Sequence, residues 1–512
     1  MEDWLYYFLS ITFSLAIYLL LPSLRRATGK APAVSPAPLP PGPAALFSFG
    51  LILFLARSNY GIDLIIRTAR SWYCPVFTIY FLSTPVVVVA DRTVARRVLR
   101  PAHHHVPGYG PLWRALRHNL AASVLHPSCL RRHAAARRAA LSGLVAGIAR
   151  QMRGAGGGAV VVVDLLHRAM FHVLAAVCFG DEDGLDDALV ESVTALQREL
   201  LTSIVAFQVF GTCPPVTKIL FRRRWKRMLS IRRRQEEIYV PLIRARMARR
   251  DAAGESFAAT CYVDSLLGLR IPDDGGAGTR HLTESEMVAL CAELLASGTD
   301  TTVAVMQWTM ANLVVRPEIQ AKVRAEIDGV AGAGDAILDA DEHLLQRMEY
   351  LRAVVLEALR RHPPARFMLP HAGTDEAAAT LDGFGVPRHT AVNFTLASMA
   401  LDDAVWPDAK QFRPERFLPG GEGEDVDLTA SSKEIKMMPF GAGRRVCPGI
   451  GMAMLHLQYF VANLVREFRW EKVPGETVNL KERLEMSLVM KRPLRANVVP
   501  LTSRACMHKS TV

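Results

Sequence analysis

Cysteine is sparse in this 512-residue chain, and its spacing excludes two classes of protein. The eight cysteines lie at positions 74, 129, 178, 213, 261, 291, 447 and 506. No two of them have the close spacing of a metal-ligand pair, and they are too few and too scattered for a disulfide framework. We therefore expect the globular part of the chain to occupy a reducing compartment.

Signatures of nucleotide binding are also missing. The glycine-rich stretch at 154–158 has no Lys-Ser/Thr after it, so it does not form a phosphate-binding loop. The pair of glycines at 441 and 443 lacks both the preceding strand and the third glycine of a dinucleotide-binding fingerprint. Basic runs at 222–227 and 232–234 accompany a net charge of +12 but no recognisable nucleic-acid-binding motif. We expect no nucleic acid partner; a solvated helix face, anionic lipid or an acidic redox partner each explains these runs.

The N-terminus carries a long apolar segment. Residues 4–21 are mostly apolar, and a helix of that length spans about 27 Å, close to a bilayer core. A cleaved signal peptide is the alternative, but Glu2 and Asp3 replace its basic start and no clear cleavage site follows. We predict a membrane anchor at 1–22, a basic and proline-rich linker at 23–45, and one globular domain at 46–512. Basic residues after the apolar segment place that domain in the cytosol.

The stretch at 439–449 surrounds a cysteine with glycines and arginines. An apolar series at helical spacing follows from 450 to 468, so Pro448 fits the first helical position and Cys447 the N-cap. The positive end of the helix dipole favours an anionic sulfur there, and Arg445 can reach an anionic group. A thiolate beneath a flat, anionic macrocycle describes a haem iron with a cysteine ligand. A buried structural cysteine is the alternative.

The same stretch resembles the haem-binding signature of the cytochrome P-450 superfamily, F-x-x-G-x-R-x-C-x-G. The residues that carry it are Phe440, Gly443, Arg445, Cys447 and Gly449. Chance would produce this match in roughly one of ten thousand chains of this length. The resemblance implies haem b with cysteine thiolate ligation, and a mainly α fold with a small β portion. Residues 77–80 and 86–89 have the composition of two strands joined by a turn, which suits that β portion. The motifs are similar to those of plant-type microsomal members.

A long helix is predicted from about residue 284, since Thr283 and Glu286 form a capping box. Its middle, 296–302, gathers Gly, Thr and Asp, which are poor helix formers, and we expect a local distortion there. The segment resembles the family's oxygen-binding motif, with Ser297 in place of the usual Ala or Gly. The resemblance makes Asp300 and Thr301 the acid–alcohol pair that delivers protons to dioxygen. A helix kink packed against its neighbours is the alternative.

Further residues match the family in chain order. Trp113 and Arg117 are four apart on one helix face and resemble the family's W-x-x-x-R helix, which binds a haem propionate; a surface pair is the alternative. His371 follows Leu369-Pro370, where the family often places another propionate contact. Glu357 and Arg360 are three apart on a helix that His362-Pro363-Pro364 ends. Residues 412–417 resemble the family's P-E-R-F element. The resemblance makes Glu357, Arg360 and Arg416 a buried triad that fixes the loop presenting Cys447.

One segment departs from the family. Only about a dozen residues separate Arg100 from Trp113, whereas related enzymes have a longer loop over the substrate. Three adjacent histidines at 103–105 lie in it; neighbouring residues rarely converge on one metal ion, so we expect an exposed loop. The turn at 486–488 contains further candidate pocket residues.

The resemblance implies a monooxygenase that inserts one oxygen atom of O2 into a small, lipophilic substrate. Electrons would come from an NADPH-dependent flavoprotein reductase at the endoplasmic reticulum membrane. The short segment motivates an alternative, a haem-binding but catalytically impaired membrane protein. A second alternative is a haem-thiolate isomerase or dehydratase that needs no reductase. The Asp300–Thr301 pair argues against it, because such enzymes need no proton relay to dioxygen.

Overall fold

The computed structural model describes residues 38–43, 62–81, 84–99, 110–154, 159–180, 187–211, 214–273, 278–331, 342–369, 371–372, 379–387, 390–429 and 434–501. The predicted anchor, most of the linker and the segment with the three histidines lie outside these residues. The predicted mainly α architecture with a small β portion is confirmed. The chain falls into two compact units. Unit 1 comprises Met1–Tyr109, Arg366–Pro407 and Val426–Val446, and unit 2 comprises Gly110–Ala365, Asp408–Asp425 and Cys447–Val512.

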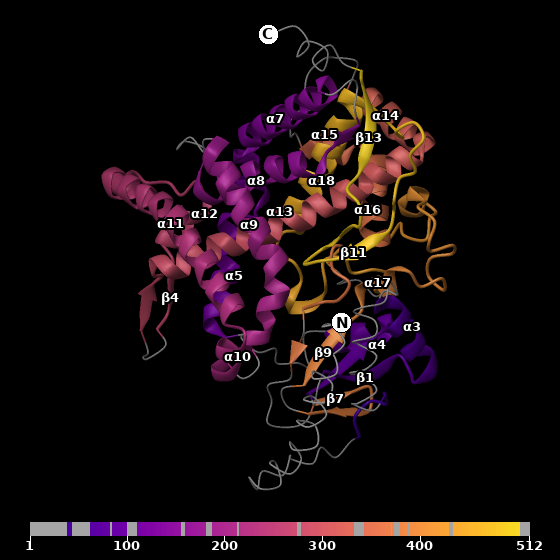
Figure 1. Ribbon diagram of the computed structural model, residues 1–512, viewed down its shortest axis with the longest axis horizontal. Helices are drawn as coiled ribbons and strands as arrows, with labels where there is room; N and C mark the ends of the chain where they lie inside the picture. The colour runs from indigo at the N-terminus through magenta and orange to yellow at the C-terminus, as the bar shows by residue number, and fades with distance from the viewer. Residues whose placement is uncertain are drawn as a thin grey trace, which may run out of the picture. The chain divides into compact units, whose positions relative to one another are not determined.

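Unit 1 is built on a sheet of order β1-β2-β9-β6, of which β1 and β9 are labelled in Figure 1. Strands β1 (Val76–Phe81) and β2 (Thr84–Val89) form the predicted antiparallel pair, with Val76 opposite Val89. Strand β9 (Ala391–Phe394) runs parallel to β2, and β6 (His371–Ala372) runs antiparallel to β9. The unit also holds the hairpin β7 (Ala379–Leu381)–β8 (Phe384–Val386), helices α3 (Ile62–Trp72), α4 (Arg92–Leu99) and α17 (Leu396–Ala400), and the short 3-10 helix η4 (Gly443–Arg445).

The end of the proline-rich segment is part of unit 1. The backbone N–H of Thr78 donates to the carbonyl of Pro41 at 2.9 Å, and its hydroxyl donates to the carbonyl of Pro40 at 2.8 Å. A Cβ built on Gly42 would lie 1.9 Å from the carbonyl oxygen of Thr78. Only glycine therefore lets the segment approach β1 this closely.

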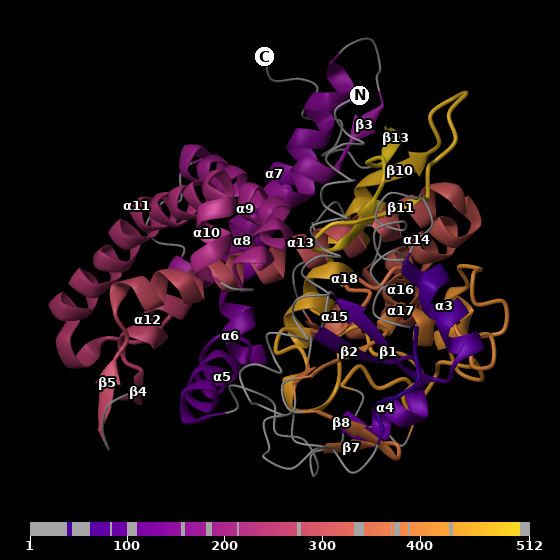
Figure 2. The same cartoon turned by 60° about the horizontal axis from the view of Figure 1, so that its bottom comes forward.

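Unit 2 holds most of the helices (Figure 2). They are α5 (Pro111–Ser123), α6 (Pro127–Arg132), α7 (Ala134–Arg153), α8 (Val163–Phe179), α9 (Asp187–Phe207), α10 (Pro214–Leu220), α11 (Arg222–Ala253), α12 (Tyr262–Leu267), α13 (Glu284–Val315), α14 (Pro317–Ala331), α15 (Glu342–Gln346), α16 (Glu349–Arg361) and α18 (Ile450–Glu467), with 3-10 helices η1 (Gln208–Gly211), η2 (Gly254–Ser256) and η3 (Pro414–Phe417). Strands β10 (Phe468–Glu471), β13 (Arg495–Pro500) and β3 (Val160–Val161) form one small sheet. The hairpins are β4 (Arg270–Pro272)–β5 (Thr279–His281) and β11 (Glu482–Leu484)–β12 (Leu488–Met490).

Helix α13 runs through the middle of unit 2 beside α8, α9, α16 and α18 (Figures 1 and 2). The predicted capping box at Thr283 and Glu286 is present. By length and composition α13 would suit a membrane span, but 56% of its most apolar stretch is buried inside the protein, as in a core helix. The indole N–H of the fully buried Trp308 donates to the carbonyl of Leu488 at 2.9 Å and so ties α13 to β12.

Candidate functional site

The middle of α13 is rich in hydroxyl groups that bond back to the helix. Ser297, Thr301 and Thr302 each donate to the carbonyl four residues earlier, at 2.7, 2.6 and 2.8 Å. Such back-bonding is the expected behaviour of these hydroxyls, and α13 runs without interruption from Glu284 to Val315. The local distortion expected at 296–302 stays a prediction. A carbonyl oxygen has two lone pairs, so it can accept the hydroxyl and its helical N–H together.

Gly298 brings the middle of α13 close to two other helices. A Cβ built there would lie 2.9 Å from Cδ1 of Leu174 on α8 and 3.6 Å from Cε of Met452 on α18. A Cβ built on Gly449 would lie 3.9 Å from Met452 Cε and 3.9 Å from Sγ of Cys447. Within unit 2, the segment that carries Asp300 and Thr301 is therefore a neighbour of the loop that carries Cys447.

Cys447 lies just before α18, but it is not the N-cap. The cap is Gly449 and the helix begins at Ile450, so the placement of Pro448 at the first helical position was also wrong. Cys447 is a half-buried free thiol. Burial raises its pKa, while a hydrogen bond from the backbone N–H of Gly449 and the charge of Arg117 act in the opposite direction. Burial outweighs these two effects and leaves the pKa of the thiol above its ordinary value, so the expected preference for an anionic sulfur is not met; the N–H group that the sulfur accepts belongs to the cap residue.

Phe440, Gly443 and Arg445 of the same motif belong to unit 1. Gly443 has a φ of 71°, which favours glycine, and a Cβ there would lie 2.6 Å from the carbonyl oxygen of Leu99. Phe440 and Arg445 are half-buried. His371, also in unit 1, pairs through its backbone with Val392 of β9. In unit 2, Trp113 and Arg117 are both half-buried on α5, which confirms that they share a helix.

The structure brings Glu357, Arg360 and Arg416 together, and all three side chains are fully buried in unit 2. Arg360 forms a two-point ion pair with Glu357, through Nε at 2.7 Å and Nη2 at 2.8 Å. Nε of Arg416 lies 3.6 Å from Oε1 of Glu357. The backbone N–H of Arg413 donates to the same oxygen at 2.9 Å, and Arg360 also donates to the carbonyl of Ala409 at 2.8 Å. One carboxylate thus connects α16 to the segment that contains η3.

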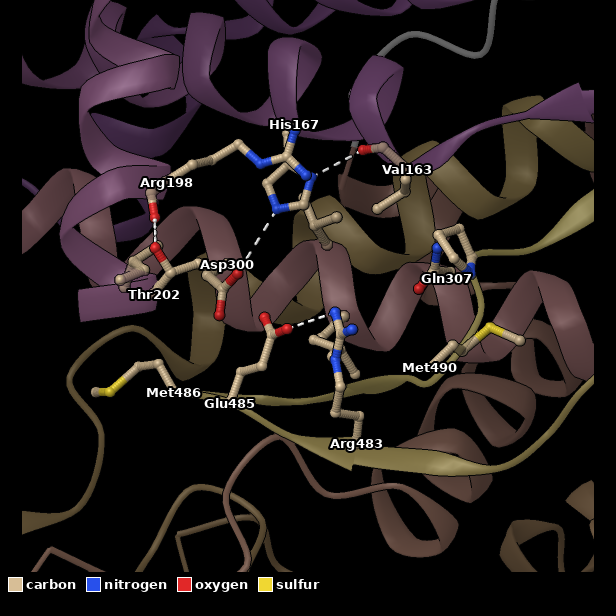
Figure 3. Close-up of a pocket in the computed structure, with 15 residues that line it drawn as sticks. Val163, His167, Arg198, Thr202, Asp300, Gln307, Arg483, Glu485, Met486 and Met490 are labelled. Carbon is tan, nitrogen blue, oxygen red and sulfur yellow. Dashed lines mark hydrogen bonds and ion pairs between the residues drawn. The ribbon is translucent and has the colours of Figure 1, made fainter. Parts of the chain in front are cut away.

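A cavity of about 190 Å³ opens beside α13 in unit 2 (Figure 3). Asp300 forms part of its wall, and Nε2 of His167 lies 3.6 Å from Oδ1 of Asp300. Gln307, seven residues after Asp300 on the same face of α13, also lines it. The other lining residues come from α8, α9 and the segment around β11 and β12: Val163, Arg198, Leu201, Thr202, Val303, Ala304, Arg483, Glu485, Met486, Val489, Met490 and Pro493.

The surroundings of Asp300 keep it ionised. Burial raises its pKa, but interactions with His167 and Ser487 and the charge of Arg198 outweigh that effect and leave the pKa below its ordinary value. Sequence reasoning found Asp300 but missed His167, Arg198 and Gln307. Of these three, only Gln307 could have been found in the sequence, because its helical spacing from Asp300 places both residues on one face of α13. His167 and Arg198 lie near Asp300 but belong to different helices.

Comparisons with known proteins point to one family. The family model described as cytochrome P-450 matches residues 40–498. Cytochrome P-450 89A9 of Arabidopsis thaliana is 39% identical over 489 residues, 90% of this chain and 94% of that protein. Flavonoid 3'-monooxygenase CYP75B3 of Oryza sativa subsp. japonica is 29% identical over 525 residues, 96% of each chain. A solved structure of retinoic acid-bound cyanobacterial CYP120A1 matches with a TM-score of 0.68 at 21% identity, over 91% of this chain and 100% of that chain; this likeness bears on the fold alone.

Proposed function

The chain belongs to the cytochrome P-450 family of monooxygenases, and from this premise we propose that it inserts one oxygen atom of O2 into a small, lipophilic organic substrate. The observation that carries the proposal is the proximity, within unit 2, of the Cys447 loop to the α13 segment with Asp300 and Thr301. That segment supplies an ionised acid and an alcohol on consecutive residues. Similarity to a flavonoid 3'-monooxygenase supports the insertion of oxygen into a small organic molecule.

We propose haem b as the cofactor, held by the thiolate of Cys447. The residues present fit this group. The sulfur is half-buried and accepts the backbone N–H of Gly449. Because residue 449 is glycine, it places no side chain beside the sulfur. When bound, the haem supplies electron transfer and the activation of O2. By resemblance, Phe440, Gly443 and Arg445 belong to the same binding loop. Trp113, Arg117 and His371 are the proposed contacts of the propionates.

The protein's own groups would then manage protons and support the cysteine loop. Asp300 is ionised at neutral pH and can take up a proton at its carboxylate. The hydroxyl of Thr301 donates to the carbonyl of Ser297 in the structure, and its oxygen can still accept a proton from the acid. We propose that this pair delivers protons to the reacting oxygen. By resemblance, the triad of Glu357, Arg360 and Arg416, whose charges are buried and paired, would support the loop that presents Cys447.

We further propose an NADPH-dependent flavoprotein reductase as the electron donor and the endoplasmic reticulum membrane as the location, with residues 1–22 as a single anchor and a cytosolic catalytic domain. The surface near α10 and α11 supports contact with lipid. Ile219 and Leu220 are 80% and 67% exposed, directly before the basic run at 222–227. Exposed apolar side chains beside basic ones are typical of a membrane-contacting surface.

Turnover with the reductase and isotopically labelled O2 tests this function. The proposed reaction consumes NADPH only with substrate and places one labelled oxygen atom in the product. A product formed without NADPH would indicate the isomerase or dehydratase alternative. If a broad substrate panel gave neither turnover nor a ligand-induced spectral shift, the result would indicate the catalytically impaired alternative. The short segment before Trp113 is the observation that suggests this alternative.

A further inference from the structure

His167 is held in one orientation against Asp300. Its Nδ1 lies 2.8 Å from the carbonyl oxygen of Val163, one turn earlier on α8. A carbonyl can only accept, so Nδ1 carries a hydrogen. The other ring nitrogen, Nε2, faces Oδ1 of Asp300 at 3.6 Å (Figure 3). The imidazole is 8% exposed, so few other orientations are open to it.

This orientation makes the contact depend on one proton. With Nδ1–H committed to Val163, a neutral imidazole presents a lone pair at Nε2 to an ionised carboxylate, which is unfavourable. A protonated imidazole presents an N–H at Nε2 and a positive charge instead. At 3.6 Å the contact is an ion pair rather than a direct hydrogen bond. The Asp300 carboxylate is therefore able to form a hydrogen bond with another group.

The other charged groups around Asp300 already have partners. Arg198 on α9 donates to Asp164 at 2.6 Å, and Arg483 on β11 pairs with Glu485. Ser487 in the turn between β11 and β12 interacts with the Asp300 carboxylate but carries no charge. Histidine is the residue type among these whose charge ordinarily changes near neutral pH.

The adjoining cavity can supply the protons. Its volume of about 190 Å³ leaves room for several water molecules. Gln307 on its wall is 3% exposed, and its amide nitrogen Nε2 is buried without a hydrogen-bond partner. A buried amide in that condition is normally satisfied by an ordered water. The cavity therefore has both the space and the polar lining of a wet site.

We propose that His167 is a positioning residue for Asp300, which holds the carboxylate at the cavity and keeps a proton at Nε2 within its reach. A proton passes from Nε2 to Oδ1 of Asp300 through one bridging cavity water and is replaced at Nε2 from the cavity, and Asp300 passes it on to the hydroxyl of Thr301. This inference rests on the proposed monooxygenase function. It adds a residue and a route of proton supply that the family motif does not contain.

The test compares His167→Gln with His281→Gln, a matched change at an exposed position on β5. Full-length enzyme with reductase and substrate is assayed for product and hydrogen peroxide per NADPH. We expect His167→Gln to lower product per NADPH by about ten-fold, with peroxide rising in its place, and His281→Gln to match the native protein. Unchanged coupling in His167→Gln would overturn the proposal.

Two further variants separate proton supply from folding. His167→Lys keeps a cation opposite Asp300, so it should retain more coupling than His167→Gln. In an Asp300→Asn background, His167→Gln should have no further effect on coupling, because the residue it acts through is gone. A full additional loss in that background would show that His167 acts elsewhere.

Melting temperatures provide a readout that needs no turnover. The losses from His167→Gln and Asp300→Asn should be non-additive, because each substitution breaks the same pair. Additive losses would contradict the pairing. Absence of the haem-thiolate spectrum or of any turnover in the native protein would instead be a failure of the proposed function, and the melting cycle still tests the pair in that case.

Discussion

Replacing Glu357 by glutamine should destabilise the protein more than any comparable change at its surface. The substitution keeps the shape of the side chain but leaves Arg360 and Arg416, both fully buried, without the carboxylate they share. Arg416 keeps a second carboxylate, Glu422, at 3.4 Å, whereas Arg360 loses its two-point pair. Breaking such a buried pair costs about 3–5 kcal/mol. With an unfolding entropy of about 2.1 cal/mol/K per residue over 512 residues, that loss lowers the melting temperature by about 3–5 °C.

The assay follows thermal unfolding of the purified protein by circular dichroism and by the Soret band together. Glu476→Gln is the matched control, since Glu476 pairs with Arg495 at 3.4 Å with both side chains about half exposed. Such a pair contributes about 1 kcal/mol or less, so the control should shift by less than 1 °C. If the triad supports the cysteine loop, the Soret band of Glu357→Gln should be lost before the helical signal. Equal melting temperatures for the two variants would show that the buried Glu357 carboxylate contributes no more to stability than an exposed one.

Four other substitutions have outcomes that the structure determines. Thr301→Ala should keep the haem spectrum but divert electrons from product to peroxide, measured as product per NADPH, because the hydroxyl that passes the proton is removed. Gly443→Ala should lose haem on purification, because its Cβ would lie 2.6 Å from the Leu99 carbonyl at a φ of 71°, whereas Gly451→Ala in α18, with no atom within 4 Å, should be stabilised by about 0.5–1 kcal/mol. The lowered pKa of Asp300 means that its carboxylate stabilises the fold above its ordinary value of 3.8 and that this contribution is lost as pH falls through the lower, folded-state pKa. Melting temperatures between pH 5 and 3 should therefore fall less steeply in Asp300→Asn than in the native protein.

Local patterns in the sequence predicted the elements that depend on local chemistry. The valine-rich run at 86–89 formed a strand because β-branched residues favour one, and the spacing of Thr283 and Glu286 located the start of α13. The P-E-R-F element located Arg416, which lies beside Glu357 in the structure. Only the resemblance to a family linked residues this far apart in the sequence.

What sequence reasoning got wrong or missed has physical causes. The predicted start of α18 lies two residues before the observed one. Proline fits both a turn and the first position of a helix, so Pro448 alone does not fix where the helix begins. In the structure the N–H of Gly449 bonds to the Cys447 sulfur, and the helix begins after it. His167 was missed because one histidine on the largely buried helix α8 shows nothing in sequence of its contact with Asp300 on α13. A contact between two helices is set by their packing, which periodicity does not encode.

The most direct test of the central claim is the CO-difference spectrum of the reduced, membrane-expressed protein, measured beside Cys447→Ala and the matched variant Cys74→Ala. Cys74 is another half-buried free cysteine, but it lies outside the proposed haem site. The account predicts a red-shifted Soret band that Cys74→Ala keeps and Cys447→Ala loses. A band typical of histidine-ligated haem, or a thiolate band that survives in Cys447→Ala, would contradict it.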